Sequence, residues 1–332
     1  MLSENHFDYT SKKYLSYHHF LTSFGIDLYK IDPLKSDCST RRYYRIFSDL
    51  GSHILMDSSE DPSITAFISM GNILKKYNLK SPQIFATDLQ AGYLLIEDFG
   101  NYSLTKYLQS NLAEEEKLYR SCTKVLIEIA QASAPDHQIP NYDIKLLNNE
   151  LEVFCHWYLK QRVDPKTFTK AHVELIEIFG NLFKSLSLLP QVLTLRDFMA
   201  DNIMVIENEV GLNKIGLIDF QDAAIGACVY DLVSLLEDAR RDVSSRVTEK
   251  CKSMFRKSLK LPPDHFESGY AILGLQRNLK IVGIFHRMNL RDNKPSYLGY
   301  LPRVWKHILN ALSNDIAHPL KQWFCKYDVY NK

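Results

Sequence analysis

The segment Leu195-Arg196-Asp197-Phe198-Met199-Ala200-Asp201-Asn202 decides the fold, because it carries an Asp and, five residues later, an Asn. Apolar runs flank it, and we predict short strands at Val192 to Leu195 and at Ile203 to Val205. A third apolar run, Lys214 to Ile218, ends directly before Asp219. Since binding and catalytic residues are most often found on loops held by rigid elements, these polar residues at strand ends mark a candidate site.

The spacing of these polar residues suits one kind of chemistry. An Asp-x₄-Asn loop followed by a strand and a further Asp is typical of phosphoryl transfer. That reaction needs a carboxylate to orient a hydroxyl group and accept its proton, and hard oxygen ligands for Mg²⁺. Asp197 suits the first role, and Asn202 and Asp219 suit the second. The alternative is that these residues only cap turns, as Asp and Asn commonly do.

Composition is that of an ordinary globular protein, with 24% charged and 45% hydrophobic residues among 332. Lys and Arg (40) nearly balance Asp and Glu (39), so nothing in the net charge suggests nucleic acid or a membrane surface as partner. Apolar runs are shorter than the roughly 20 residues of a membrane span, and the first residues lack the layout of a signal peptide, so we expect a cytoplasmic protein.

The six cysteines form no C-x-x-C pair, which argues against a structural zinc site and a redox motif; we interpret them as reduced packing residues.

The chain changes its hydrophobic period near residue 97. Before it, five short strands are predicted, at Asp27 to Leu34, Arg42 to Ser48, His53 to Asp57, Gln83 to Asp88 and Tyr93 to Glu97. One helix interrupts them, from Ser63 to about Tyr77. From about Tyr102 the pattern is mainly helical, for example in Glu114 to Ala130. The sequence therefore predicts an α+β protein with a small, mainly β lobe followed by a larger, mainly α lobe.

Five longer runs of the sequence carry a resemblance to known proteins, and one of them contains Asp219. They are Ser36 to Arg45, Leu217 to Ala223, Tyr230 to Asp242, Gln276 to Lys280 and Leu301 to Trp305. With these motifs the chain resembles the aminoglycoside phosphotransferase and choline kinase superfamily, over nearly its whole length. Within that superfamily it is most similar to the bacterial anomeric kinases for N-acetylmuramate and N-acetylglucosamine. The motifs are specific for the superfamily and suggestive for the subgroup.

The resemblance implies a protein-kinase-like fold, with a nucleotide-binding lobe at 1–97, a hinge at 98–101 and a catalytic and substrate lobe at 102–332. It also implies that Asp197 is the catalytic base and that Asn202 and Asp219 bind the metal. Glu97, Asp98 and Phe99 would then meet the adenine or guanine edge through their backbone groups. Asp98-Phe99-Gly100 spells the metal-loop triplet of protein kinases, but its place after the last strand of the small lobe favours the hinge.

The chain departs from the superfamily pattern at three places, of which the last two bear on the phosphates. Leu195 stands where many relatives have His, which removes a packing hydrogen bond but leaves the base in place. The strand His53 to Asp57 has no Lys, and the helix Ser63 to Tyr77 has no Glu. The ion pair that normally holds the α- and β-phosphates is therefore missing on both sides.

An arginine is the expected substitute for the missing lysine, because a guanidinium group can bind phosphate bidentately. The candidates are Arg41, Arg42 and Arg45, of which we choose Arg42; the alternative is that all three are solvated strand residues. The preceding turn has no glycine, and Ser39 and Thr40 would bind phosphate through backbone N–H and hydroxyl groups.

Candidate substrate residues lie after the metal loop. Asp222 is expected to bind a second metal or a substrate hydroxyl, or else to cap a helix, whereas Asp231 is expected to hold loop backbone. At about 100° per residue, four cationic side chains share one helix face, which is either solvated or part of a sugar site: Arg277, Lys280, Arg287 and Arg291. Arg240, Arg241 and Arg303 would join Arg277 around a neutral or anionic sugar, and the same field would repel a polycationic aminoglycoside.

Three functions are compatible with these observations. The leading one is a Mg²⁺-dependent kinase that uses ATP or GTP to phosphorylate an amino sugar, with the anomeric hydroxyl of N-acetylmuramate or N-acetylglucosamine as the expected acceptor, for cell-wall recycling. The second is a kinase of the same superfamily for another alcohol, such as an aminoglycoside, choline or homoserine. The third is a nucleotide-binding pseudoenzyme, supported by the missing lysine and by Leu195.

Overall fold

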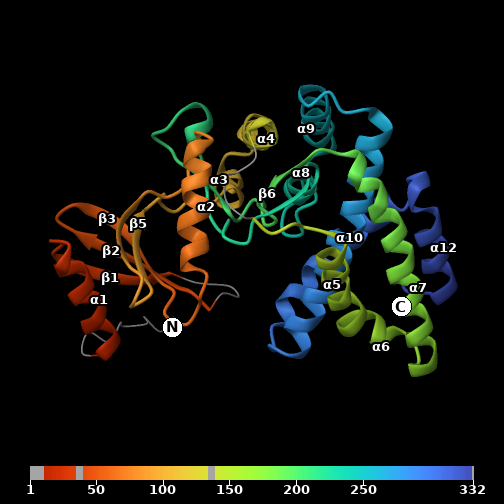
Figure 1. Ribbon diagram of the computed structural model, residues 1–332, viewed down its shortest axis with the longest axis horizontal. Coiled ribbons are helices and arrows are strands. Elements are labelled where there is room, and N and C mark those ends of the chain that lie inside the picture. Colours follow the sequence, from red (N-terminus) through yellow and green to blue (C-terminus); the bar gives the residue numbers. More distant parts are fainter. Residues whose placement is uncertain (1–10, 35–39, 134–138, 331–332) are drawn as a thin grey trace. The chain divides into compact units, whose positions relative to one another are not determined.

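A five-stranded antiparallel sheet forms the centre of the N-terminal part of the chain (Figure 1). The computed structural model describes residues 11–34, 40–133 and 139–330. In spatial order the strands are β1 (Leu28–Leu34), β2 (Arg42–Ser48), β3 (Gly51–Asp57), β5 (Tyr93–Glu97) and β4 (Ile84–Asp88). The five predicted strands are thus confirmed, with shifts of at most two residues at their ends.

Helix α1 (Lys12–Ser23), which the sequence pattern did not reveal, packs on one face of this sheet. Its Tyr17, Phe20 and Leu21 meet alternate residues of the strands, such as Ile46 and Leu55, because successive strand side chains point to opposite faces. The α1 residues Lys13 and Tyr17 also bind the buried Asp57 at the end of β3, at 2.8 and 2.6 Å. These two contacts satisfy a carboxylate that stands in the strand lacking the lysine.

Helix α2 (Ile64–Lys76) lies on the other side of the sheet (Figure 1). Its Phe67 ring stacks on Phe220, with centroids 4.9 Å apart. The short strands β7 (Ile203–Val205) and β8 (Ile215–Leu217) pair with each other, and Leu217 donates its N–H to the Lys80 carbonyl at 2.8 Å. A Cβ on Gly216 would come within 2.7 Å of the Phe99 ring, so only glycine permits this approach.

The chain forms two compact units, which interleave along the sequence. The first comprises Met1–Tyr102 and Met204–Gln221, and the second comprises Ser103–Ile203 and Asp222–Lys332. The first contains the five-stranded sheet and the second is mainly helical, so the predicted α+β class is confirmed.

The second unit is built around the 28-residue helix α10 (Pro263–Leu290) (Figure 1). Its apolar side chains are buried nearly all round, which is the pattern of a central helix. The other helices are α3 (Leu104–Ser110), α4 (Glu115–Gln131), α5 (Ile144–Phe154), α6 (Lys160–Arg162), α7 (Pro165–Lys184), α8 (Tyr230–Leu236), α9 (Ser245–Ser258), α11 (Leu301–Ala311) and α12 (His318–Tyr327). A π-helical segment, Cys155–Leu159, continues directly from α5.

A two-stranded antiparallel sheet within this unit places the candidate catalytic loop. Strand β6 (Gln191–Thr194) leads into the loop, and β9 (Ala224–Ala227) pairs with it just before α8. The Thr194 hydroxyl donates to the Ala224 carbonyl at 2.8 Å, which reinforces the pairing. The loop at 195–202 therefore starts from a fixed strand end.

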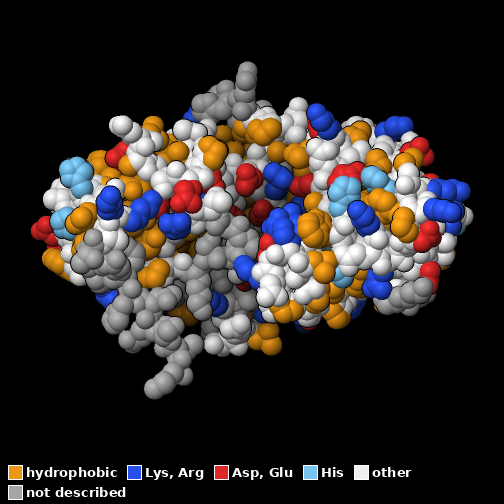
Figure 2. Space-filling model, turned by 90° about the horizontal axis from the view of Figure 1, so that it is seen from below, with side chains coloured by type: hydrophobic (Ala, Val, Ile, Leu, Met, Phe, Trp, Pro, Cys, Tyr) orange, Lys and Arg blue, Asp and Glu red, His pale blue; other side chains and the backbone are white. Residues whose placement is uncertain are grey.

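The surface carries charges of both signs. On the face shown in Figure 2, Lys and Arg side chains are interspersed with Asp and Glu, in keeping with a net charge of +1. Within residues 11–34, 40–133 and 139–330, no helix combines the length and the apolar character needed to span a bilayer.

Candidate active site

Asp231 fixes the start of the 195–202 loop, as the sequence predicted for this residue. It lies on α8, is 2% exposed, and accepts the backbone N–H groups of Leu195 and Arg196 at 2.6 and 2.9 Å. Burial raises the pKa of Asp231 to about 7, and the two N–H groups oppose that rise. The carboxylate thus acts as a buried acceptor for loop backbone rather than as a group that reaches a substrate.

A second buried carboxylate, Asp238, fixes the end of the same loop. It is 1% exposed and accepts the N–H groups of Ala200 and Arg240 at 3.0 and 2.8 Å. Burial raises its pKa as well. Sequence reasoning missed Asp238; the only available signal was that it lies seven residues after Asp231 in the Tyr230 to Asp242 run.

The side chain of Arg196 also holds the loop in place. Its φ of +69° lies in the left-handed region, a strained conformation for a residue with a side chain. The guanidinium donates to Glu150 at 2.7 Å and to the Asp222 carbonyl at 3.0 Å, and lies 5.0 Å from the centroid of Tyr142. These contacts hold the partly buried Arg196 side chain in place and fix the turn of the loop.

Glu150, on α5, is the anionic centre of this anchor. It also accepts from Lys280 and Gln276 at 3.0 Å each. Burial alone would raise the pKa of Glu150, but Lys280, Tyr142, Gln276 and Arg196 lower it to about 2. Neither Glu150 nor Lys280 had been assigned this role from the sequence, because they lie 130 positions apart.

Asp197 itself is exposed, whereas Leu195, Phe198 and Ala200 around it are buried. Asn202 lies next to it in the folded loop, since its amide nitrogen donates to the Asp197 carbonyl at 3.0 Å. This bond fixes the orientation of the amide, with its oxygen on the side away from the Asp197 carbonyl. The predicted base and the first predicted metal ligand therefore belong to one rigid turn.

Asp219, the second predicted metal ligand, belongs to the first unit and has a φ of +59°. Its Oδ1 accepts from Arg41 at 3.3 Å and from Gln221 at 3.0 Å, and its side chain is 40% exposed. Holding a non-glycine residue in this conformation costs on the order of 1–3 kcal/mol, which the stacking of Phe220 on α2 helps to offset.

The three arginines of β2 and its approach have three different environments. Arg41 is buried and contacts both Asp219 and, at 3.8 Å, Asp61. Arg42 is exposed and pairs with Glu60 at 3.2 Å. Arg45 forms a bidentate pair with Asp98, at 2.6 and 2.9 Å, and donates to the Gly100 carbonyl. Of the three, Arg41 rather than our choice Arg42 therefore contacts the candidate metal loop.

The remaining residues predicted to bind nucleotide have identifiable contacts where the structure describes them. Thr40 donates its hydroxyl to Asp61 at 2.7 Å, and Ser39 lies outside the described residues. Glu97 accepts from Lys80 at 2.6 Å and from the N–H of Gln83. Asp98 is held by Arg45, and Phe99 packs against Gly216, so the predicted hinge is a well-fixed turn.

The arginines proposed for the sugar are engaged within the second unit. Arg241 pairs with Glu115 at 2.7 Å and Arg303 with Asp242 at 2.7 Å, while Arg240 lies 3.5 Å from Asp201. Arg277 is 4% exposed. Burial raises the pKa of Asp231, Glu237 and Asp238, and the charge of Arg277 opposes that rise. The alternative of a fully solvated cationic face is therefore wrong for Arg277. The contact of Arg277 with a sugar stays a prediction. The role of the Asp222 side chain stays a prediction as well.

Known protein families and relatives match this chain over most of its length. Residues 30–251 match the family model described as the phosphotransferase enzyme family. A relative from Pseudomonas aeruginosa, named N-acetylmuramate/N-acetylglucosamine kinase, is 30% identical over 289 residues, which cover 85% of this chain and 83% of the relative. A relative of the same name from Caulobacter vibrioides is 26% identical, covering 93% of this chain and 94% of the relative.

Solved structures share the fold at low sequence identity. The choline kinase LicA from Streptococcus pneumoniae has a TM-score of 0.64 at 13% identity, covering 90% of this chain and 100% of that one. A GDP complex of aminoglycoside 2'-phosphotransferase-IIIa has a TM-score of 0.62 at 15% identity, covering 89% and 98%. From the family match and these relatives, the chain belongs to the phosphotransferase enzyme family and is a small-molecule kinase.

Proposed function

We propose that this kinase transfers the γ-phosphate of ATP or GTP to an amino sugar, at the anomeric hydroxyl of N-acetylmuramate or N-acetylglucosamine. The names of the relatives from Pseudomonas aeruginosa and Caulobacter vibrioides support the choice of sugar. The observation that carries the chemistry is the 195–202 loop, in which two buried carboxylates bind the backbone and leave Asp197 exposed. Such a loop presents one carboxylate in a fixed position.

Asp197 has the role of general base in this proposal. Its carboxylate accepts a hydrogen bond from the sugar hydroxyl and so orients the oxygen toward the γ-phosphorus. As the new oxygen–phosphorus bond forms, the bond to the β-phosphate oxygen breaks and the proton passes to Asp197. The nucleoside diphosphate leaves with the electron pair of the broken bond. Positioning is the main contribution of the protein, because the base is rigidly held.

Asn202 and Asp219 fit a magnesium ion, since they offer an amide oxygen and a carboxylate, the hard ligands that Mg²⁺ prefers. The bond from the Asn202 amide nitrogen to the Asp197 carbonyl fixes which end of the amide is the ligand. When bound, Mg²⁺ neutralises charge on the phosphates as it develops.

Arg41 is the best candidate for the cation that replaces the missing lysine. Its side chain is 8% exposed, and Asp61 holds its Nε side while its Nη2 reaches Asp219. Asp61 is itself bound by Thr40 and by the Ser63 N–H, which lower its pKa and keep it charged. A guanidinium fixed in this way beside the proposed metal ligand suits the binding of a phosphate oxygen.

Nucleoside diphosphate release measured with different acceptors tests the sugar. We expect turnover with N-acetylmuramate and N-acetylglucosamine and little with choline, homoserine or an aminoglycoside. The methyl glycoside of N-acetylglucosamine, in which the anomeric oxygen is blocked, is the matched control and should not react. Turnover of the glycoside would contradict the anomeric assignment alone, whereas no turnover with either free sugar would contradict the choice of sugar.

A further inference from the structure

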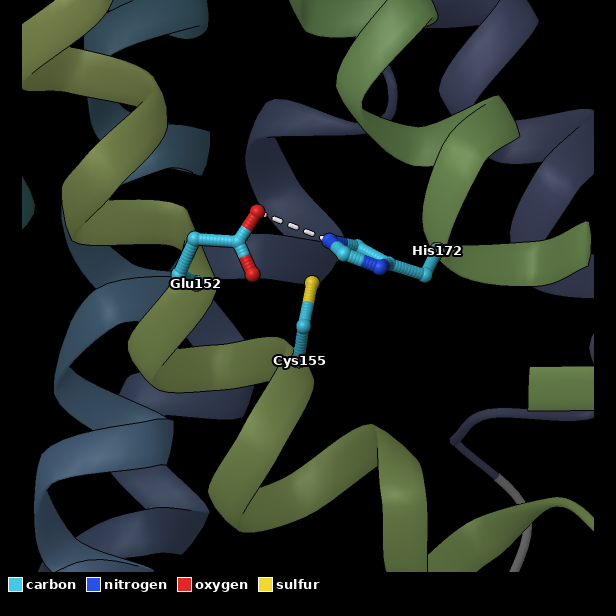
Figure 3. Close-up of side chains that lie close together, drawn as sticks. All are labelled: Glu152, Cys155 and His172. Carbon is cyan, nitrogen blue, oxygen red and sulfur yellow. Dashed lines mark hydrogen bonds and ion pairs between the residues drawn. The ribbon is translucent and has the colours of Figure 1, made fainter. Parts of the chain in front are cut away.

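Three side chains of the second unit converge at the junction of α5 and α7. They are Glu152, Cys155 and His172, and their candidate ligand atoms all lie within 4.8 Å of one another. Figure 3 shows the Cys155 sulfur pointing toward the space between the carboxylate and the imidazole. The Nε2 atom of His172 lies 2.7 Å from Oε1 of Glu152.

The local fold explains why these residues meet. Glu152 is in the last turn of α5, and Cys155 begins the π-helical segment Cys155–Leu159, so the two project from neighbouring positions on one side. Helix α7 brings His172, whose ring stacks on Phe168 with an interplanar angle of 20°. Single π-helical turns are rare in proteins and are frequently found at functional sites.

The three donors form a chemically distinct set. A thiolate sulfur, an imidazole nitrogen and a carboxylate oxygen are the ligands of Zn²⁺, whereas Mg²⁺ prefers oxygen alone. Cys155 is fully buried, and the Glu152 and His172 side chains are 36% and 24% exposed, so the donors face solvent on one side and the interior on the other. An ion can therefore reach the cluster without unfolding of the helices.

The donors also suit the charge of a divalent cation. Glu152 and Cys155 bring a carboxylate and a thiol within 4.8 Å of each other and of the His172 imidazole. A divalent cation binds the thiolate and the carboxylate together, and its binding releases the thiol proton.

We propose that Glu152, Cys155 and His172 bind a Zn²⁺ ion that fastens α7 to the end of α5. His156 is the expected fourth ligand: its Nε2 lies 3.8 Å from Glu152, and its side chain is 60% exposed and able to turn. With His156 the ligands number four, the coordination number that Zn²⁺ takes in structural sites, and Cys, His and Glu are each ligands that Zn²⁺ accepts. The proposed metal is separate from the Mg²⁺ of phosphoryl transfer and shares no residue with it.

Cobalt titration of the metal-stripped, full-length kinase tests the site, because Co²⁺ bound to a thiolate gives a sulfur-to-metal charge-transfer absorption. We expect this absorption to saturate at one Co²⁺ per chain and to be removed by Zn²⁺ but not by Mg²⁺. Cys155→Ala should abolish it. His172→Gln should weaken zinc affinity by at least about tenfold, the loss commonly seen even when only an outer partner of a metal ligand is removed.

Cys325→Ala is the matched control, since Cys325 is exposed on α12, and it should leave the absorption unchanged. Thermal unfolding gives a second measurement: Zn²⁺ should raise the Tm of the parent protein and of Cys325→Ala but not of Cys155→Ala. If the absorption is absent in the parent, or persists in Cys155→Ala, the proposal is wrong and the cluster is a Glu–His hydrogen bond beside a packing cysteine. A kinase assay is not needed for either result.

Discussion

The two loops that carry the proposed catalytic residues are fixed in different ways. In the 195–202 loop the buried acids Asp231 and Asp238 bind backbone N–H groups, and Asp197 stays exposed. In the loop at Asp219 the functional carboxylate itself is paired with a cation, Arg41. The first arrangement fixes a backbone and presents a base; the second keeps a carboxylate and a guanidinium together where phosphate and metal are proposed to bind.

Removal of the Asp197 carboxylate should have the largest effect on the activity of the kinase. Asp197→Asn should lower kcat by about 10²–10⁴-fold, the usual contribution of a positioned general base, while nucleotide affinity stays unchanged. Single-turnover kinetics and calorimetry measure the two quantities. Asp201→Asn, in the same loop, is the control and should change kcat only a few-fold. Equal activity of Asp197→Asn and the parent would exclude the proposed mechanism.

Low pH should weaken the contacts by which Glu150, through Arg196, holds the 195–202 loop. Its pKa is about 2 in the folded protein against 4.5 ordinarily, so its stabilising contribution is complete above pH 4.5 and is lost as pH falls toward 2. The shift corresponds to about 3 kcal/mol of unfolding free energy. Urea unfolding at pH 7, 5 and 3 should show Glu150→Gln less stable at pH 7 and less dependent on pH below 5. Parallel pH profiles for the variant and the parent would contradict this role.

Removal of one backbone acceptor should loosen the same loop. Asp238→Ala leaves the buried N–H of Ala200 without its acceptor and should lower the unfolding free energy by about 2 kcal/mol. It should also lower kcat more than it raises KM, because Asp197 loses its fixed position. Asp242→Ala, which removes an exposed partner of Arg303, should cost less than about 1 kcal/mol. Similar losses in the two variants would mean that Asp238 does not hold the loop.

The smallest effect on activity is expected from Arg41, which contacts the loop at Asp219. Arg41→Ala should raise KM for the nucleotide by about tenfold, the equivalent of one charge-assisted hydrogen bond, and Arg41→Lys should restore part of the loss. Arg42→Ala is the matched control, because Arg42 pairs with the exposed Glu60 instead. If Arg42→Ala weakens nucleotide binding and Arg41→Ala does not, the phosphate contact belongs to Arg42.

Local patterns were sufficient to predict most of the secondary-structure elements of the small lobe and to nominate the candidate catalytic residues. Short β-like runs identified the five strands, and the helical period identified α2 and α4, because both signals lie within a few residues. The Asp-x₄-Asn spacing marked one loop in the same way, and Asp231 was correctly expected to hold loop backbone. Helix α1 was not predicted, since more than half of its residues are polar and its apolar residues follow the helical period only weakly.

The sequence by itself was enough to indicate a two-lobed small-molecule kinase and to propose Asp197, Asn202 and Asp219 as its catalytic base and metal ligands, because those signals lie in short, contiguous segments. Only the tertiary structure decided which charged and metal-binding side chains lie in contact. Arg41 and Asp219 are 178 positions apart, Glu150 and Lys280 are 130 apart, and His172 joins Glu152 and Cys155 from another helix. Absence of a C-x-x-C pair spoke against zinc, yet helix packing assembles a mixed donor set that no local spacing reveals. Such contacts depend on the packing of whole elements, and packing is set by the complete fold.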